Sequence, residues 1–268
     1  MTELTILDED RSLPATTDKY LADDKDLSEG RRYRFEHLSM PVVLGDMAFG
    51  KDDPGPGDRI PDFDLTTLDG GRFRSADLTE TGPALLVFGS YTCPVTESAA
   101  PGLNQLRERF GGQVRFVMVN VREAHPGKNV PQPQSMDQKT SHAEQLRDAH
   151  GFNFEVVLDD IDGTLHRALS PKPNSAYIVD WEGTILFRVQ WANDTNALAE
   201  ALEAVTEGKA LRRLQSRDLV RPMLSMLRYG APVFDRAGKG ARRDMWRSMP
   251  PIALIGIVLK TLHIGPRN

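Results

Sequence analysis

The segment that decides the fold reads Pro83-Ala-Leu-Leu-Val-Phe-Gly-Ser-Tyr-Thr-Cys93-Pro-Val-Thr96 and contains the only cysteine of the chain. Its residues 84–88 form a short apolar run, which is typical of a buried parallel strand. Proline suits the first position of a helix, so a helix is expected to begin at Pro94. Apolar side chains then recur at helical spacing, at Leu103, Leu106 and Phe110. The pattern predicts a strand followed by a helix that Cys93 caps.

Cys93 is therefore expected to be a redox nucleophile. Free N–H groups and the positive end of the helix dipole favour thiolate over thiol, which predicts a lowered pKa. The alternative is a cysteine that only fills the core, as free cysteines commonly do. A single cysteine excludes an internal disulfide and any multi-cysteine zinc site. A redox cycle at Cys93 would thus require an external thiol as reductant.

The composition is that of an ordinary soluble globular protein, with 268 residues, 40% hydrophobic and 26% charged. The start, MTELTILDEDRSLP, has neither the basic nor the apolar segment of a signal peptide, so a cytoplasmic location is expected. The net charge of −5 conceals an asymmetry. From Thr206 to Asn268 there are 13 Lys and Arg against four Asp and Glu, so this part carries +9 and the remaining 205 residues carry −14.

This charge asymmetry predicts that the basic part packs on its own domain or forms a homo-oligomer. Nucleic acid ranks below these partners because no binding module is recognisable. The apolar run 252–259 has eight residues, whereas a bilayer span needs about 20. Contact with a membrane surface is therefore not favoured either.

Three regions are expected along the chain. Residues 1–55 read as an acidic N-terminal arm that ends in a Pro/Gly linker. Residues 56–206 read as an α/β domain, and residues 207–268 as a basic, helical C-terminal extension with a Gly-rich break at 237–243.

The expected elements of the α/β domain begin with a hairpin at 62–73, joined by Asp-Gly-Gly. A strand at 114–121 completes a βαβ unit, and a capping-box pattern at Ser135 starts a helix that runs to His150. The rest are a strand at 154–158, a turn at 159–163, a short helix at 165–169, a hairpin at 175–190 and a helix at 195–206. This order predicts a thioredoxin-like fold, with a central mixed sheet flanked by helices.

A second candidate segment, Arg122-Glu-Ala-His-Pro126, follows the second strand of the βαβ unit. Ligands bind beyond the carboxyl ends of parallel strands, so Glu123 and His125 are expected at the same end of the sheet as Cys93. His125 is a candidate for holding the proton of a leaving group. The alternative is a solvated histidine in a surface loop.

These two segments carry a resemblance to a known family. Gly89-Ser-Tyr-Thr-Cys-Pro94 resembles the active-site segment of the iodothyronine deiodinases, Gly-Ser-x-Thr-selenocysteine-Pro, with cysteine in place of selenium. Glu123-Ala-His-Pro126 is similar to their Glu-Ala-His segment after the next strand. His142 lies near a second histidine of that family, and Pro173 matches the proline before their Leu-Tyr-Val strand. The resemblance spans roughly residues 59–203.

The resemblance implies a deiodinase-like redoxin with a thioredoxin-like fold. Cys93, His125 and Glu123 would be catalytic, and the supporting or substrate-binding residues would be Ser90, Tyr91, Thr92, Pro94, Thr96, His142 and Pro173. After Pro126 the chain reads Gly-Lys-Asn-Val where the deiodinases have Ser-Asp-Gly-Trp, and it lacks their N-terminal membrane anchor. The fold also implies a cis Lys172–Pro173 peptide bond beside Cys93, with Pro171 as a competitor.

Peroxiredoxins are the neighbouring alternative. Ser90 occupies their Thr/Ser position before the nucleophile, but Leu86 stands where they have proline. Thioredoxins fit less well, because Thr96 replaces the second cysteine of Cys-x-x-Cys. The Thr96 hydroxyl could instead donate to a Cys93 thiolate. No metal-ligand set or dinucleotide motif is recognisable, so neither a metal nor a bound cofactor is expected.

The sequence thus predicts an oxidoreductase in which Cys93 attacks a small-molecule soft electrophile, a halogenated aromatic or a peroxide, and an external thiol closes the cycle. A one-cysteine peroxidase resembling the peroxiredoxins is one alternative. The other is a non-catalytic module for redox sensing or assembly, in which the basic extension mediates association.

Overall fold

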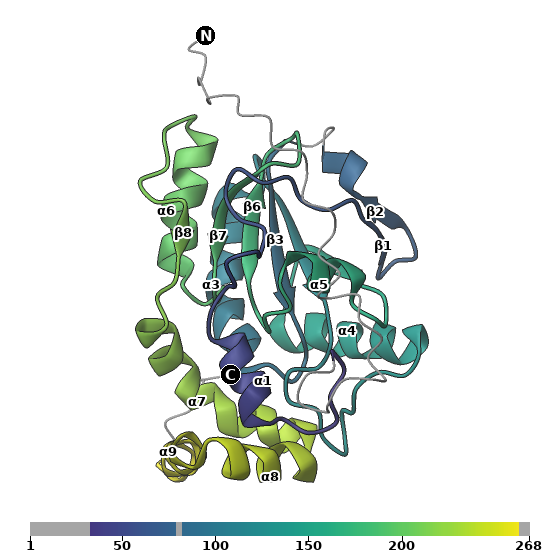
Figure 1. Ribbon diagram of the computed structural model, residues 1–268, viewed down its shortest axis with the longest axis vertical. Coiled ribbons are helices and arrows are strands. Elements are labelled where there is room, and N and C mark those ends of the chain that lie inside the picture. Colours follow the sequence, from purple (N-terminus) through teal and green to yellow (C-terminus); the bar gives the residue numbers. More distant parts are fainter. Residues whose placement is uncertain (1–32, 79–81, 263–268) are drawn as a thin grey trace.

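The computed structural model describes residues 33–78 and 82–262 (Figure 1). In this part of the chain the strands form one eight-stranded mixed sheet in the order β2-β1-β5-β4-β3-β6-β7-β8. The strands are β1 Asp64–Thr67, β2 Arg72–Arg74, β3 Ala84–Gly89, β4 Arg115–Asn120, β5 Glu155–Leu158, β6 Ala176–Val179, β7 Ile185–Val189 and β8 Gln215–Ser216. The helices are α1 Met40–Asp46, η4 Ser75–Asp77, α3 Pro94–Phe110, α4 Met136–His150, α5 Thr164–Leu169, α6 Thr195–Thr206, α7 Val220–Ala237, α8 Lys239–Ser248 and α9 Pro250–Thr261.

β3 lies inside the sheet, parallel to β4 and antiparallel to β6. All its residues are buried, and successive side chains alternate between the two faces. Leu85 and Val87 belong to the core cluster that also contains residues of α3, α4 and α6. Leu86 and Phe88 belong to the opposite cluster, which includes residues of α5. A mixed sheet covered on both faces confirms the predicted thioredoxin-like fold.

The helix and strand boundaries around the predicted site follow the sequence signals closely. α3 begins at Pro94 with Cys93 at its N-cap position. α4 begins after Ser135, whose Oγ accepts a hydrogen bond from the Gln138 N–H (3.3 Å). The hairpin of β1 and β2 and the hairpin of β6 and β7 are both antiparallel, as predicted.

The C-terminal extension packs on its own chain, which is one of the two arrangements predicted from its charge. α7 lies against α3 and α9, and α8 lies against α7 and α9 (Figure 1). Arg236 of α7 forms an ion pair with Glu97 of α3 (2.8 Å). The predicted break at 237–243 is wrong in extent. Only Gly238 departs from helical geometry, with φ +102°, and α8 starts at the next residue.

The described part of the predicted arm, residues 33–55, is packed rather than extended. Phe35, Leu38 and Val42 are buried against Val233 and Met245 of the extension. Phe35, Leu38 and Val42 stand at helical spacing, but the acidic and polar residues of this region favoured an arm, so α1 was not predicted. No helix among the described residues is both long and apolar enough to cross a membrane.

Candidate active site

Cys93 lies where β3 leads into α3. Its carbonyl accepts the Glu97 N–H (3.0 Å), and its own N–H donates to the Ser90 carbonyl (3.3 Å). The side chain is only 1% exposed. The structure therefore confirms the predicted position at the helix start, and it places the sulfur out of contact with bulk water.

The pKa of Cys93 moves in the direction opposite to that expected from the helix start. Burial raises it from 9.0 to about 11, because a thiolate loses its hydration there. Hydrogen bonds from the Thr96 side chain and from the N–H groups of Val95 and Thr96 lower the pKa, but by less than burial raises it. The prediction of a lowered pKa for Cys93 is thus wrong, and the resting sulfur is a thiol.

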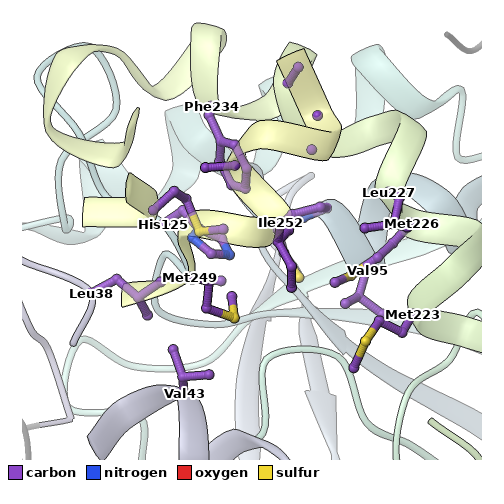
Figure 2. A pocket seen from close by; sticks show the side chains of 18 of the residues that line it. Leu38, Val43, Val95, His125, Met223, Met226, Leu227, Phe234, Met249 and Ile252 are labelled. Carbon is purple, nitrogen blue, oxygen red and sulfur yellow. The ribbon is translucent and has the colours of Figure 1, made fainter. Parts of the chain in front are cut away.

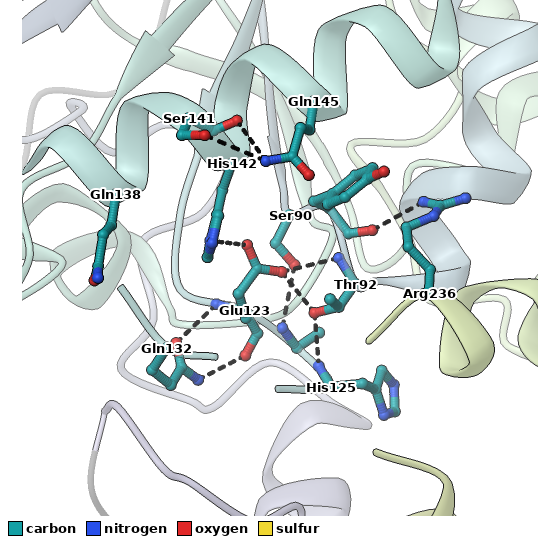
Figure 3. Close-up of polar contacts among 12 residues, drawn as sticks. Ser90, Thr92, Glu123, His125, Gln132, Gln138, Ser141, His142, Gln145 and Arg236 are labelled. Atoms are coloured by element: carbon teal, nitrogen blue, oxygen red, sulfur yellow. Dashed lines mark hydrogen bonds and ion pairs between the residues drawn. The ribbon is translucent and has the colours of Figure 1, made fainter. Parts of the chain in front are cut away.

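The Cys93 segment and the loop after β4 are joined by their own hydrogen bonds (Figure 3). The Ala124 N–H donates to Ser90 Oγ (3.1 Å), and the His125 N–H donates to Thr92 Oγ1 (3.1 Å). The buried hydroxyls of Ser90 and Thr92 therefore fix the backbone of the histidine loop beside the cysteine segment.

Glu123 is the centre of this network and is 1% exposed (Figure 3). Its Oε2 accepts from the Thr92 N–H (2.9 Å) and Oγ1 (2.5 Å), and its Oε1 lies 3.1 Å from His142 Nδ1. Gln132 binds its backbone N–H and carbonyl. The carboxylate has these partners on all sides and does not face the cavity described below. Glu123 and His142 therefore hold the two loops together, and neither of them lines the cavity.

Cys93 and His125 both line one cavity of about 560 Å³. The α/β domain contributes Cys93, Pro94, Val95, His125, Pro173 and Trp191. The opposite wall comes from α1 and from α7, α8 and α9, and most of its side chains are apolar (Figure 2). The predicted residues Cys93, Pro94, His125 and Pro173 are thus brought together at one surface.

His125 is held edge-on against Phe234 of α7, with ring centroids 4.9 Å apart (Figure 2). Burial lowers its pKa to about 4, so the ring is neutral near pH 7. Its Nδ1 is buried and has no hydrogen-bond partner among the residues that the structure describes. A free imidazole nitrogen beside a thiol can accept or deliver a proton during a reaction at the sulfur.

The remaining predicted residues lie behind the cavity. Tyr91 lies under Arg236, whose guanidinium is 4.5 Å from the ring centroid and donates to the Tyr91 carbonyl (3.1 Å). The Thr96 Oγ1 accepts from Asn174 Nδ2 (3.1 Å), which leaves its proton free to bond the Cys93 sulfur. Both residues support the cysteine segment from outside the cavity.

The predicted cis Lys172–Pro173 bond is wrong, because no peptide bond within the described residues is cis. The chain turns instead at Ser170, three residues before Pro173, where φ is +129°. The Lys172 N–H donates to the Ser170 carbonyl (2.7 Å), and the Lys172 carbonyl lies 2.6 Å from His166 Nε2. This turn brings Pro173 to the cavity with a trans bond.

Sequence reasoning missed Asp46 and Trp191, which both line the cavity. Burial raises the pKa of Asp46 to about 6, while the positive charges of Arg122 and Lys172 lower it. Unlike Cys93 and His125, Asp46 is therefore a group beside the cavity that can change its charge near neutral pH. No local sequence pattern identifies these two residues, because α1 and the loop after β7 meet only in the folded chain.

The raised pKa of Cys93 gives a testable pH dependence. Iodoacetamide reacts with the thiolate, so its rate with Cys93 should rise about tenfold per pH unit from pH 7 to 10 without levelling off. The urea-unfolded protein is the control and should level off near the ordinary thiol pKa. A plateau below pH 8 in the folded protein would show that the helix start outweighs burial.

A single cysteine between β3 and α3 of a thioredoxin-like fold is the arrangement of a redoxin domain. Residues 56–188 match the AhpC/TSA family, and the domain that they form belongs to it. No curated protein matches the chain.

Three solved structures illustrate the similarity. A hypothetical protein from Sinorhizobium meliloti 1021 is 19% identical over 60% of this chain and 88% of its own, with a TM-score of 0.49. Peroxidoxin BcpB from Mycobacterium tuberculosis is 18% identical over 57% and 98%, with a TM-score of 0.44. A secreted disulfide oxidoreductase from the same organism, homologous to E. coli DsbE, is 24% identical over 53% and 95%, with a TM-score of 0.42.

Proposed function

We propose that the protein is a thiol-dependent reductase of a soft electrophile carried by an apolar small molecule. The supporting observation is that Cys93 and His125, whose Nδ1 has no hydrogen-bond partner among the described residues, line the same largely apolar cavity. A halogenated aromatic is the first candidate substrate. Its ring matches the apolar walls, and its halogen is a soft target for sulfur.

In this reaction the Cys93 thiol loses its proton as its sulfur bonds to the halogen, and the carbon–halogen bond breaks. The carbon keeps the electron pair and takes a proton, for which we assign His125 as the carrier. Sulfur is thereby oxidised by two electrons and carbon is reduced. A first external thiol displaces halide from the sulfur and forms a mixed disulfide. A second thiol releases Cys93 and leaves as the external disulfide.

A peroxide is the second candidate, and membership of the AhpC/TSA family favours it. The sulfur would then attack one peroxide oxygen, giving a sulfenic acid on Cys93 and an alcohol. The first external thiol would condense with the sulfenic acid and release water, and the second would close the cycle as before.

The two candidates are separated by a turnover assay on the purified full-length chain with dithiothreitol as the external thiol. Iodinated and brominated phenols are tested for halide release, and cumene hydroperoxide and hydrogen peroxide are tested for consumption. Halide release with one disulfide formed per halide supports the first candidate. Peroxide consumption alone supports the second. Turnover of neither class overturns the proposal and favours the redox-sensing or assembly module.

A further inference from the structure

The cavity wall opposite the α/β domain, formed by α1 with its C-cap and by α7, α8 and α9, is rich in methionine. Five of the nine methionines of the chain line the cavity: Met47, Met223, Met226, Met245 and Met249. Methionine is unbranched and polarizable, so such a wall adapts to the outline of an apolar molecule. A volume of about 560 Å³ lies in the range of sites that enclose whole organic ligands. The wall therefore fits a long apolar body, not a small polar oxidant.

The deep end of the cavity holds a second unpartnered polar atom besides His125 Nδ1. Trp191 packs in one buried cluster with Cys93, Val95 and Met226 and is 4% exposed. Its Nε1–H is buried without a hydrogen-bond partner among the described residues. An indole N–H can only donate, so the group that completes it must be an acceptor. A ligand oxygen beside Cys93 would satisfy it.

The outer end of the cavity is charged. Asp235, Arg242 and Lys260 line it. Arg242 Nε lies 3.3 Å from Asp235 Oδ1, and Lys260 Nζ contacts Asp235 Oδ2. Two cations thus share one carboxylate, which leaves this rim with a net positive charge. Both cationic side chains are more than half exposed, so they remain open to a further anion.

We propose that the cavity binds an amphipathic anion. Its apolar body lies along the methionine wall, a polar acceptor reaches Trp191 beside Cys93, and its anionic group lies at Arg242 and Lys260. If this anion is the substrate, the proposal rests on the proposed function, because the end of the ligand beside Cys93 is then the end that reacts. The proposal that the cavity binds such an anion does not depend on turnover. Long-chain carboxylic acids are the simplest members of this class.

The binding test uses the full-length Cys93→Ser variant, which keeps the cavity and removes the reactive sulfur. The probe is 11-(dansylamino)undecanoic acid, displaced by dodecanoic acid or by 1-dodecanol. We expect saturable probe binding and displacement by the acid at lower concentration than by the alcohol. Absence of binding, or equal displacement by acid and alcohol, would overturn the proposal.

The contribution of the rim is tested by Arg242→Gln with Lys260→Gln. Its matched control is Lys239→Gln with Arg247→Gln, which removes the same charge from exposed positions of α8 that do not line the cavity. The first pair should weaken binding of dodecanoic acid about tenfold, and the control should leave it within about twofold. Equal loss in both would refute a local anion site. Lys260→Gln alone repeats the test if the double variant is unstable.

The hydrogen bond from the Trp191 N–H to an acceptor on the ligand is tested by Trp191→Phe, which removes the N–H but keeps an aromatic ring. In the Cys93→Ser protein, which keeps Trp191, 12-hydroxydodecanoic acid should bind about threefold to tenfold more tightly than dodecanoic acid. This factor corresponds to the free energy of one such hydrogen bond. The phenylalanine variant should bind both alike. A preference that survives in this variant would overturn the assignment of Trp191. Binding without turnover in the wild-type protein would count against the proposed function only.

Discussion

Replacing Cys93 by serine should abolish thiol-dependent turnover, with a loss of roughly 10³-fold or more. A serine hydroxyl is far too weakly acidic to replace the thiol, and it cannot form the mixed disulfide through which the external thiol closes the cycle. Halide release or peroxide loss, followed with dithiothreitol present, measures the effect. Mass spectrometry of the wild-type protein quenched during turnover should show the adduct at this single residue.

The control for this variant is its unchanged structure. The serine oxygen can accept the hydrogen bonds that the Thr96 side chain and the N–H groups of Val95 and Thr96 make to the sulfur, so the variant should fold cooperatively and keep probe binding close to that of the wild-type protein. Wild-type turnover by a properly folded Cys93→Ser protein would end the nucleophile hypothesis and return Cys93 to a packing role.

Replacing His125 by alanine should slow turnover by roughly 10²- to 10⁴-fold, the usual range for general acid–base catalysis. The resting thiol and imidazole are both neutral, because burial raises the pKa of Cys93 to about 11 and lowers that of His125 to about 4. A proton must therefore leave the sulfur and reach the product as the bond forms. The free Nδ1 of His125 is placed to carry it.

The matched comparison for His125→Ala is Asp46→Asn, since Asp46 is the other titratable group beside the cysteine. Iodoacetamide labelling of Cys93 at pH 9 should persist in both variants, which separates proton transfer from loss of the nucleophile. If turnover falls in Asp46→Asn and stays normal in His125→Ala, the carboxylate is the proton carrier. His125 would then only fill space against Phe234.

The elements that could be predicted from sequence are those marked by local signals. β3 is a continuous apolar run, α3 begins at a proline, and α6 has a regular apolar face, so all three lie where the pattern places them. The pairing of the Cys93 segment with the loop of His125 also follows, because both continue from the carboxyl ends of adjacent parallel strands.

The far wall of the site could not be predicted in this way. Its residues come from the segment of α1, about 50 positions before Cys93, and from α7, α8 and α9, at least 130 positions after it. Their meeting depends on how α7 packs against α3. The same is true of the pKa of Cys93. The helix start that lowers it is visible in the sequence, whereas the burial that raises it involves residues distant in the sequence, such as Trp191 and Met226, which share one buried cluster with Cys93.

The bond between Arg236 and Glu97 has a consequence for the order of events at Cys93. It fastens α7 to the helix that the cysteine caps, and the Arg236 guanidinium also holds the Tyr91 carbonyl two residues before the sulfur. Because the sulfur is only 1% exposed, the electrophile and the external thiol of the proposed reaction must both reach it through the cavity. The first product therefore has to depart before a thiol can enter. A small thiol can enter the cavity, whereas a folded protein reductant would reach Cys93 only after α7 had moved away from α3.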